Sequence, residues 1–217
     1  MIERLKKNHL WAYTLVLPVY LICFYTVEYF VTDNYHVMYM PLDDKIPFCE
    51  WFSLPYILWM PMLIAAALYL LYNDTAGYKL YMTYVGISFF STLLIYVIYP
   101  NGQELRVTSF ENPNLLTDFV QYLYSCDTNT NVCPSLHVIG SFAAVFGVFH
   151  SKKLRSAALK FIIIVSAAII ALSTVFIKQH SVVDVFAGIA LSAAVWVIVY
   201  WRASALRKRL EGSVKEE

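Results

Sequence analysis

The sequence predicts an all-α polytopic membrane protein with six transmembrane helices and with both termini in the cytoplasm. Of its 217 residues, 59% are hydrophobic and only 14% are charged, and the mean hydropathy is +0.58. Since about one quarter of the residues in a soluble domain are charged, this composition excludes an ordinary soluble enzyme. It also excludes a disordered chain, because so apolar a sequence has ample surface to bury. We therefore expect a single transmembrane domain over residues 1–217.

Six apolar stretches approach the roughly 17–25 residues that a membrane-spanning helix needs, and the fourth is the shortest. They are Leu10–Val31, Ser53–Tyr72, Lys79–Tyr99, Ser135–His150, Ala158–Lys178 and Val182–Arg202. The first stretch is too long for the core of a signal peptide and no small-residue cleavage site follows it, which predicts an uncleaved membrane anchor.

Residues 100–134 form the one substantial polar connection between these stretches. This segment is too long for a plain turn, so we expect an extracytoplasmic loop that carries part of an active site. We expect the other connections to be short. Glu28 lies close to the outer end of the first helix, where we expect an interfacial residue.

The positions of Lys and Arg predict the orientation, because cytoplasmic segments carry an excess of both. With a cytoplasmic N-terminus, 13 of the 16 fall inside: Arg4, Lys6, Lys7, Lys79, Lys152, Lys153, Arg155, Lys160, Arg202, Arg207, Lys208, Arg209 and Lys215. Lys45, Arg106 and Lys178 remain outside. The net charge of +1 supplies too few cations to any one face for binding a phosphate backbone, so we expect no nucleic-acid partner.

Two of the outer histidines lie next to residues that suit phosphoryl chemistry. His180 and Asp184 are four residues apart, so they share a face if a helix begins near His180, and the carboxylate can then accept a bond from one imidazole nitrogen. The other nitrogen would gain basicity and suit a nucleophile or a general base. Alternatively, the pair only marks a helix start, where the dipole favours Asp184.

A second group of candidates opens the fourth helix. Pro134 and Ser135 predict a helix N-terminus with free N–H groups and a hydroxyl, which is a good anion site. His137 on the first turn either donates a proton to a leaving oxygen or only hydrogen-bonds to the loop or a lipid headgroup. Arg106 and Lys178 are candidate phosphate ligands because they lie outside against the orientation rule. The alternatives are a solvated loop charge for Arg106 and interfacial snorkelling for Lys178.

These residues resemble the type 2 phosphatidic acid phosphatase family. Pro134 to His137 is similar to its P-S-G-H motif, and Ser173-Thr174-x5-His180-x3-Asp184 is similar to its S-R-x5-H-x3-D motif, within a region from Tyr99 to Leu191. The resemblance implies a metal-independent membrane enzyme without cofactors. It implies His180 as the nucleophile that becomes phosphohistidine, Asp184 as its orienting partner, His137 as the acid, and Ser135 as a contact to phosphate oxygens.

The motifs also depart from the family pattern. The first family motif, K-x6-R-P, appears as Tyr99-x6-Arg106-Val107, so its arginine is present and its lysine and proline are not. Leu136 replaces the glycine of the second motif, and Thr174 replaces the arginine of the third. Lys178 is a candidate replacement for one missing cation. The P-S-L-H form also resembles inositol phosphorylceramide synthases, which transfer a phosphoryl headgroup to a lipid alcohol.

We therefore expect a lipid phosphate phosphatase of the cell (plasma) membrane, which acts on a phosphomonoester or diphosphate at the extracytoplasmic face. Its partners would be the lipid phosphate and membrane lipids; the lipid and the oligomeric state are left open. A lipid phosphotransferase is the first alternative. A transporter or scaffold that only binds headgroups is a weaker one, since internal repeats with broken helices are absent.

The four cysteines form no C-x-x-C pair, so we expect no metal site. Cys126 and Cys133 fall on the outer side, where they either close a short loop as a disulfide or remain free thiols, with Cys49 as a competing partner. Cys23 is expected to pack within the first helix.

Overall fold

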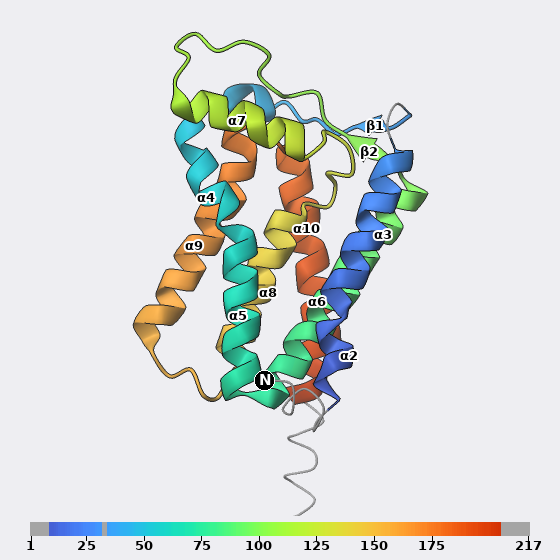
Figure 1. Cartoon of the computed structure of the whole chain (residues 1–217), viewed down its shortest axis with the longest axis vertical. Coiled ribbons are helices and arrows are strands. Elements are labelled where there is room, and N and C mark those ends of the chain that lie inside the picture. The colour runs from blue at the N-terminus through green and yellow to red at the C-terminus, as the bar shows by residue number, and fades with distance from the viewer. Residues whose placement is uncertain (1–8, 32–33, 205–217) are drawn as a thin grey trace, which may run out of the picture.

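The computed structural model describes residues 9–31 and 34–204, which form a helical bundle with one minimal two-stranded sheet (Figure 1). Five helical segments are long and apolar enough to cross a membrane: Leu10–Phe30, Glu50–Asn73, Thr75–Ile98, Ala157–Phe176 and Val182–Ser204. The shorter apolar helix Leu136–His150 is the sixth. The chain is an all-α polytopic membrane protein, as predicted.

The helices, labelled as in Figure 1, are α2 (Leu10–Thr14), α3 (Val16–Phe30), α4 (Ser53–Ile57), α5 (Trp59–Asn73), α6 (Thr75–Ile98), α7 (Leu115–Cys126), α8 (Leu136–His150), α9 (Ala157–Phe176) and α10 (Val182–Trp196). The 3-10 turns η1 (Asp43–Lys45) and η2 (Glu50–Phe52) and the π-helical turn η3 (Val197–Trp201) complete them. Strands β1 (His36–Val37) and β2 (Asn101–Gly102) pair in parallel.

Two helix boundaries differ from the expected ones for local reasons. α6 begins at Thr75 rather than Lys79, because the Asp74 carboxylate caps it by accepting a hydrogen bond of 2.9 Å from the Gly77 N–H. α9 ends at Phe176, two residues before the predicted end at Lys178. Lys178 adopts the left-handed conformation at φ 58°, and the backbone turns there.

This turn has the hydrogen bonds of a Schellman motif. The Gln179 N–H donates to the Thr174 carbonyl at 2.9 Å, and the Lys178 N–H donates to the Val175 carbonyl at 3.2 Å. A lysine therefore occupies the position where most such helix ends carry glycine. The turn fixes the direction of the segment that leads from α9 to His180.

The short helix α8 lies at the centre of the bundle, in contact with α5, α6, α9 and α10. Its buried residues include the small side chains Gly140, Ala143, Ala144 and Gly147, which let neighbouring backbones approach closely. Because α8 is enclosed by other helices, its position is fixed by protein packing. The start of α8 is therefore held at a defined depth.

Replacing Gly147 with alanine is expected to destabilise the bundle by about 1–3 kcal/mol through overpacking. A Cβ atom at this position would lie 2.5 Å from Cδ2 of Tyr81, a buried ring whose hydroxyl donates to the Leu63 carbonyl at 2.8 Å. Thermal unfolding in detergent should show a midpoint several degrees lower. Gly86→Ala is the matched control, since its Cβ would meet Val16 at 3.3 Å. Equal losses in both variants would contradict this packing argument.

The expectation of one long connection was wrong. A second long connection lies between α3 and α4. It contains strand β1, which pairs with β2, and the two turns η1 and η2. The predicted loop 100–134 is not irregular throughout, since it contains α7. The Asn114 side chain caps α7 by accepting hydrogen bonds from the N–H groups of Leu116 and Thr117.

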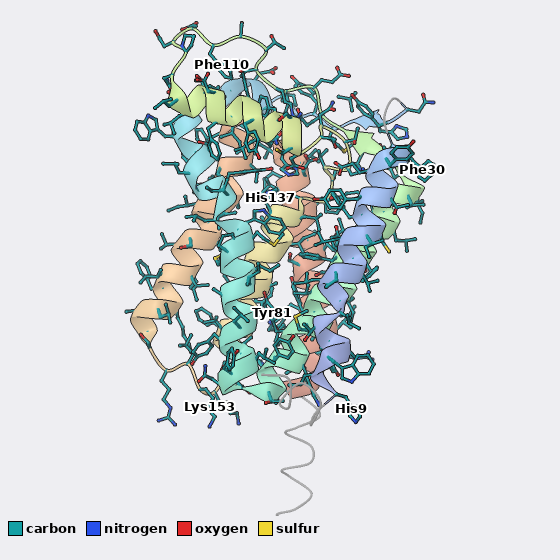
Figure 2. The ribbon with its side chains drawn as sticks, in the orientation of Figure 1. His9, Phe30, Tyr81, Phe110, His137 and Lys153 are labelled. Atoms are coloured by element: carbon teal, nitrogen blue, oxygen red, sulfur yellow. The ribbon has the colours of Figure 1, made fainter. Side chains whose placement is uncertain are left out.

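Residues that the sequence analysis assigned to opposite sides of the membrane lie at opposite ends of the bundle. Figure 2 shows His9 and Lys153 at one end and Phe110 at the other, where α7 lies; we call the latter the α7 end. Arg4, Lys6, Lys7, Arg207, Lys208, Arg209 and Lys215 lie outside the described residues, as do both termini.

Candidate functional site

A cavity of about 590 Å³ lies between α3 on one side and α4 and α5 on the other. Most of its lining is apolar, from Leu17, Pro18, Leu21, Phe24, Ile57, Met60, Ile64 and Phe89. Its polar lining includes His137 and His180. Figure 2 places His137 inside the bundle, between Tyr81 and the α7 end. The cavity therefore offers an apolar volume that leads to two imidazoles.

His137 lies on the first turn of α8, where aromatic rings from α4 and α5 pack against it. Its ring stacks on Tyr56 with centroids 4.2 Å apart and lies 4.6 Å from the ring of Trp59. The centroid of the His180 ring is 5.6 Å away, in an edge-on arrangement. Both imidazoles are thus within reach of a single phosphoryl group.

The predicted contact between His180 and Asp184 is present, with 3.2 Å between Nδ1 and Oδ2. It does not arise from a shared helix face. α10 begins at Val182, and the Asp184 carboxylate reaches back over the helix start to accept a hydrogen bond from the Ser181 N–H at 3.0 Å. Asp184 therefore acts as a helix-capping residue and as the partner of Nδ1, which leaves Nε2 of His180 available for chemistry.

The start of α8 is tied directly to the start of α10. The Ser135 N–H donates to the Asp184 carbonyl at 3.1 Å. Ser135 is the N-cap residue of α8, yet its side chain makes no capping hydrogen bond, and its buried Oγ has no partner among the described residues. A free hydroxyl therefore stands at the N-terminus of the helix that carries His137, although Ser135 itself does not line the cavity.

Asp43 fastens the N-terminus of α10 from the connection between α3 and α4. Its buried carboxylate accepts hydrogen bonds from the Ser181 hydroxyl at 2.5 Å, the Val182 N–H at 2.8 Å and the Met40 N–H at 2.8 Å. The sequence analysis did not single out Asp43. The only available signal was its place in a D-D-K run that is otherwise ordinary for a loop.

Lys178 does not line the cavity. Its Nζ donates hydrogen bonds to the carbonyl oxygens of Asp43 at 2.7 Å and Ile46 at 2.6 Å. Burial lowers the pKa of the Lys178 amine, and the carboxylates of Asp43 and Asp44 oppose this effect. The sequence analysis suggested Lys178 as a phosphate ligand. In the structure its side chain instead binds the connection between α3 and α4.

Arg106 lies behind the cavity wall. Its guanidinium donates to Gln179 Oε1 at 2.8 Å, to the Tyr124 carbonyl at 2.8 Å and to the Asp127 carbonyl, and it stacks over the Tyr124 ring at 4.7 Å. Burial lowers its pKa from the usual value of arginine, and the nearby Asp127 carboxylate opposes this shift. Arg106 therefore joins the loop after β2 to the residue that precedes His180.

Several buried polar atoms around the histidines have no hydrogen-bond partner among the described residues. They are Nδ1 of His137, Nε2 of Gln179, Oδ1 of Asp184, and both side-chain polar atoms of Asn131. Since buried polar groups are normally paired, this cluster indicates a place for a polar ligand. Sequence reasoning missed Gln179 and Asn131, although Gln179 directly precedes His180 and Asn131 lies in the polar run before Pro134.

Tyr99 and Thr174 stand where the motifs of the resembling family carry a lysine and an arginine, and no other cation among the described residues takes their place at the cavity. Tyr99 stacks on His36 with ring centroids 4.2 Å apart, and the Thr174 hydroxyl donates to the Ala171 carbonyl at 2.8 Å. Within residues 9–31 and 34–204, no lysine or arginine lines the cavity. Over the same part of the chain, no group of three potential ligands is arranged to hold a metal ion.

All four cysteines are free thiols in the structure, which favours the free-thiol alternative for Cys126 and Cys133. Cys126 is exposed, whereas burial and the nearby Asp184 carboxylate raise the pKa of the Cys133 thiol to about 12. Because the thiolate is the reactive form, the two residues should differ strongly in reactivity.

In alkylation at pH 7.5 under native conditions, we expect Cys126 to react at least about 100-fold faster than Cys133. Peptide mapping by mass spectrometry distinguishes the two sites, and the unfolded chain provides the control in which both should react. Resistance of both cysteines until a reductant is added would instead reveal a disulfide.

Comparison with known proteins gives one match. No curated protein and no solved structure matches the chain. The family model described as the PAP2 superfamily matches residues 84–208, which is more than half of the chain and includes all of α8 and α10. The two histidines and Asp184 lie within this range. The chain therefore belongs to the PAP2 superfamily.

Proposed function

We propose that the protein is an integral membrane lipid phosphate phosphatase that hydrolyses a phosphomonoester or diphosphate at the extracytoplasmic face of the cell membrane. The observation that carries the proposal is the His180–Asp184 pair beside His137 at a cavity that is otherwise mainly apolar. Membership of the PAP2 superfamily supports phosphoryl chemistry on lipids. The apolar lining would hold the lipid tail while the phosphate meets the imidazoles.

The first chemical step forms a phosphohistidine. Asp184 holds Nδ1 of His180, so Nε2 attacks the phosphorus. The new N–P bond forms while the P–O bond to the lipid breaks, and His137 donates a proton to the leaving lipid oxygen. In the second step a water molecule gives its proton to His137 and attacks the phosphorus. The N–P bond then breaks and inorganic phosphate leaves.

The charge that develops on the phosphoryl oxygens would be stabilised by fixed donors. Ser135 Oγ and the N–H groups at the start of α8 supply one set. Gln179 supplies another, because Arg106 occupies its Oε1 and leaves its Nε2 free to donate. We assign Arg106 the indirect role of orienting the Gln179 side chain. We exclude Lys178 as a phosphate ligand because its ammonium already binds two carbonyl groups.

Phosphate release from defined lipids tests the proposal. Protein purified in a neutral detergent is mixed separately with phosphatidate, phosphatidylglycerophosphate, a sphingoid phosphate and a prenyl diphosphate, each with and without a chelator. We expect inorganic phosphate from at least one lipid, at a rate that the chelator leaves unchanged. The absence of release from all four, or loss of release with the chelator, would contradict the proposal.

Transfer of the phosphoryl group to an alcohol is the second candidate, and the burial of the site favours it. His137 and His180 are only 7% and 6% exposed, and a site that restricts water disfavours hydrolysis relative to attack by a bound alcohol. Labelled lipid phosphate distinguishes the two reactions. Label in inorganic phosphate without an added acceptor indicates hydrolysis, whereas label that moves only when diacylglycerol or inositol is added indicates transfer.

A further inference from the structure

The charged residues that line the cavity are acidic. Within the described part of the chain, Glu28 and Asp127 line it and no lysine or arginine does. Glu28 comes from the last turn of α3 and lines the cavity. Asp127 follows the end of α7. Two carboxylates from distant segments thus face a cavity proposed to bind a phosphate, which is itself an anion.

Neutral donors contact these carboxylates. The Thr128 hydroxyl donates to Oε1 of Glu28, and the Tyr56 hydroxyl donates to Oδ2 of Asp127 at 2.5 Å. Neither carboxylate has a salt bridge to any residue in the described ranges. Arg106 binds the backbone carbonyl of Asp127 and attracts both carboxylates electrostatically from behind the cavity wall, without a salt bridge to either within the described ranges. Because an ionised carboxylate can accept about four hydrogen bonds, both retain capacity for a cationic ligand.

An independent feature indicates that a polar ligand belongs here. Asn131 lines the same cavity, is only 4% exposed, and has no hydrogen-bond partner for its side-chain oxygen or nitrogen among the described residues. Leaving buried polar groups without hydrogen bonds is costly, so a ligand with both donors and acceptors would satisfy them.

The aromatic lining favours the same kind of ligand. Tyr20, Phe24, Tyr25, Tyr56 and Trp59 all line the cavity. The faces of aromatic rings attract ammonium groups, and attract them more strongly where water is excluded. Carboxylates and aromatic rings together form the environment in which proteins bind amines. A dianionic phosphate without a counter-charge would meet repulsion from Glu28 and Asp127.

We propose that the cavity selects a lipid phosphate ester that carries an ammonium group two carbons from the phosphate, with Glu28 and Asp127 as the ammonium ligands. This inference rests on the phosphohistidine chemistry proposed above, and for a headgroup phospholipid it extends that chemistry from a phosphomonoester to a phosphodiester. The phosphate would meet the histidines while the ammonium offsets the two carboxylates. Two kinds of lipid have this chemistry: a sphingoid-base phosphate carries the amine on its lipid part, and an ethanolamine or choline phospholipid carries it in the headgroup.

Turnover of matched lipids provides the first test. Sphingosine 1-phosphate is compared with lysophosphatidate of similar chain length, and phosphatidylethanolamine with phosphatidylglycerol, the product being phosphate in the first pair and diacylglycerol in the second. We expect kcat/KM to be about tenfold higher for the amine-bearing lipid in one pair, and that pair identifies which part of the lipid carries the ammonium group.

The double substitution Glu28→Gln and Asp127→Asn should remove this preference, because it removes both charges while both amides still accept hydrogen bonds from Thr128 and Tyr56. Asp44→Asn with Asp118→Asn is the control, as both carboxylates are exposed at the α7 end outside the cavity.

A binding measurement separates this proposal from the proposed reaction. In maltoside micelles, dodecylphosphocholine should raise the thermal unfolding midpoint of the wild-type protein more than dodecyl phosphate does, and the difference should vanish in the Glu28→Gln/Asp127→Asn protein. This readout requires no turnover, so it stands even if no lipid is hydrolysed. Equal turnover and binding of amine and non-amine lipids, a preference for the non-amine lipid of a pair, or an amine preference that survives the double substitution would each overturn the inference and leave the phosphatase proposal intact.

Discussion

Replacement of His180 by alanine is expected to reduce phosphate release by roughly 10⁴-fold or more, because this substitution removes the proposed nucleophile and not an accessory group. Among the described residues, the His180 side chain hydrogen-bonds to Asp184 and its ring lies against His137, and neither interaction joins two helices through a charge pair that the fold requires, so the bundle should remain folded. Initial rates of phosphate release measure the loss. Size-exclusion chromatography in detergent verifies the fold.

The chemical signature and two further variants make this test specific. Wild-type protein quenched during turnover of labelled lipid phosphate should carry acid-labile label on His180, and the alanine variant should carry none. His180→Asn, which keeps a polar side chain of similar reach, should be equally inactive. His36→Ala is the control, because His36 is an exposed histidine that stacks on Tyr99 away from the cavity. Substantial turnover without His180 would exclude the phosphohistidine route.

The elements of the bundle were predictable from sequence because hydropathy alone marks a membrane span. Each of the six apolar stretches corresponds to a helix, with boundaries shifted by a few residues where caps intervene. The Asp74 cap at the start of α6 is one such case. The amphipathic helix α7 and the connection between α3 and α4 were missed, since their apolar residues pack against the end of the bundle and produce no span-length signal.

The candidate site was predictable where function depends on local spacing. The four-residue interval between His180 and Asp184 correctly predicted a contact, although a helix cap produces it. The role of Lys178 was not predictable, because a left-handed turn sets the direction of its side chain. Glu28 and Asn131 were not predictable either. They reach the cavity only through packing of α3 against the rest of the bundle, which no local pattern encodes.

Substitution of Asp184 by asparagine is expected to lower kcat by about 10²–10⁴-fold with little loss of stability. The amide oxygen can still accept hydrogen bonds from the Ser181 N–H and from Nδ1 of His180, so the cap of α10 is retained. The negative charge that stabilises the positively charged imidazole during phosphoryl transfer is lost. Initial rates and thermal unfolding in detergent, measured on the same preparation, report the two effects.

Asp43→Asn provides the matched comparison, since Asp43 fastens the same helix start and does not contact either histidine through a hydrogen bond. Its buried carboxylate accepts from Ser181 and Val182, so the amide replacement should lower the unfolding midpoint more than Asp184→Asn and lower kcat less. The two variants should thus rank in opposite order for loss of kcat and for loss of unfolding midpoint. This result would distinguish a charge that acts in the reaction from a charge that stabilises the helix start. If Asp184→Asn keeps kcat within about threefold of wild type, while Asp43→Asn loses it, the orienting role assigned to Asp184 is wrong and the docking of α10 controls activity.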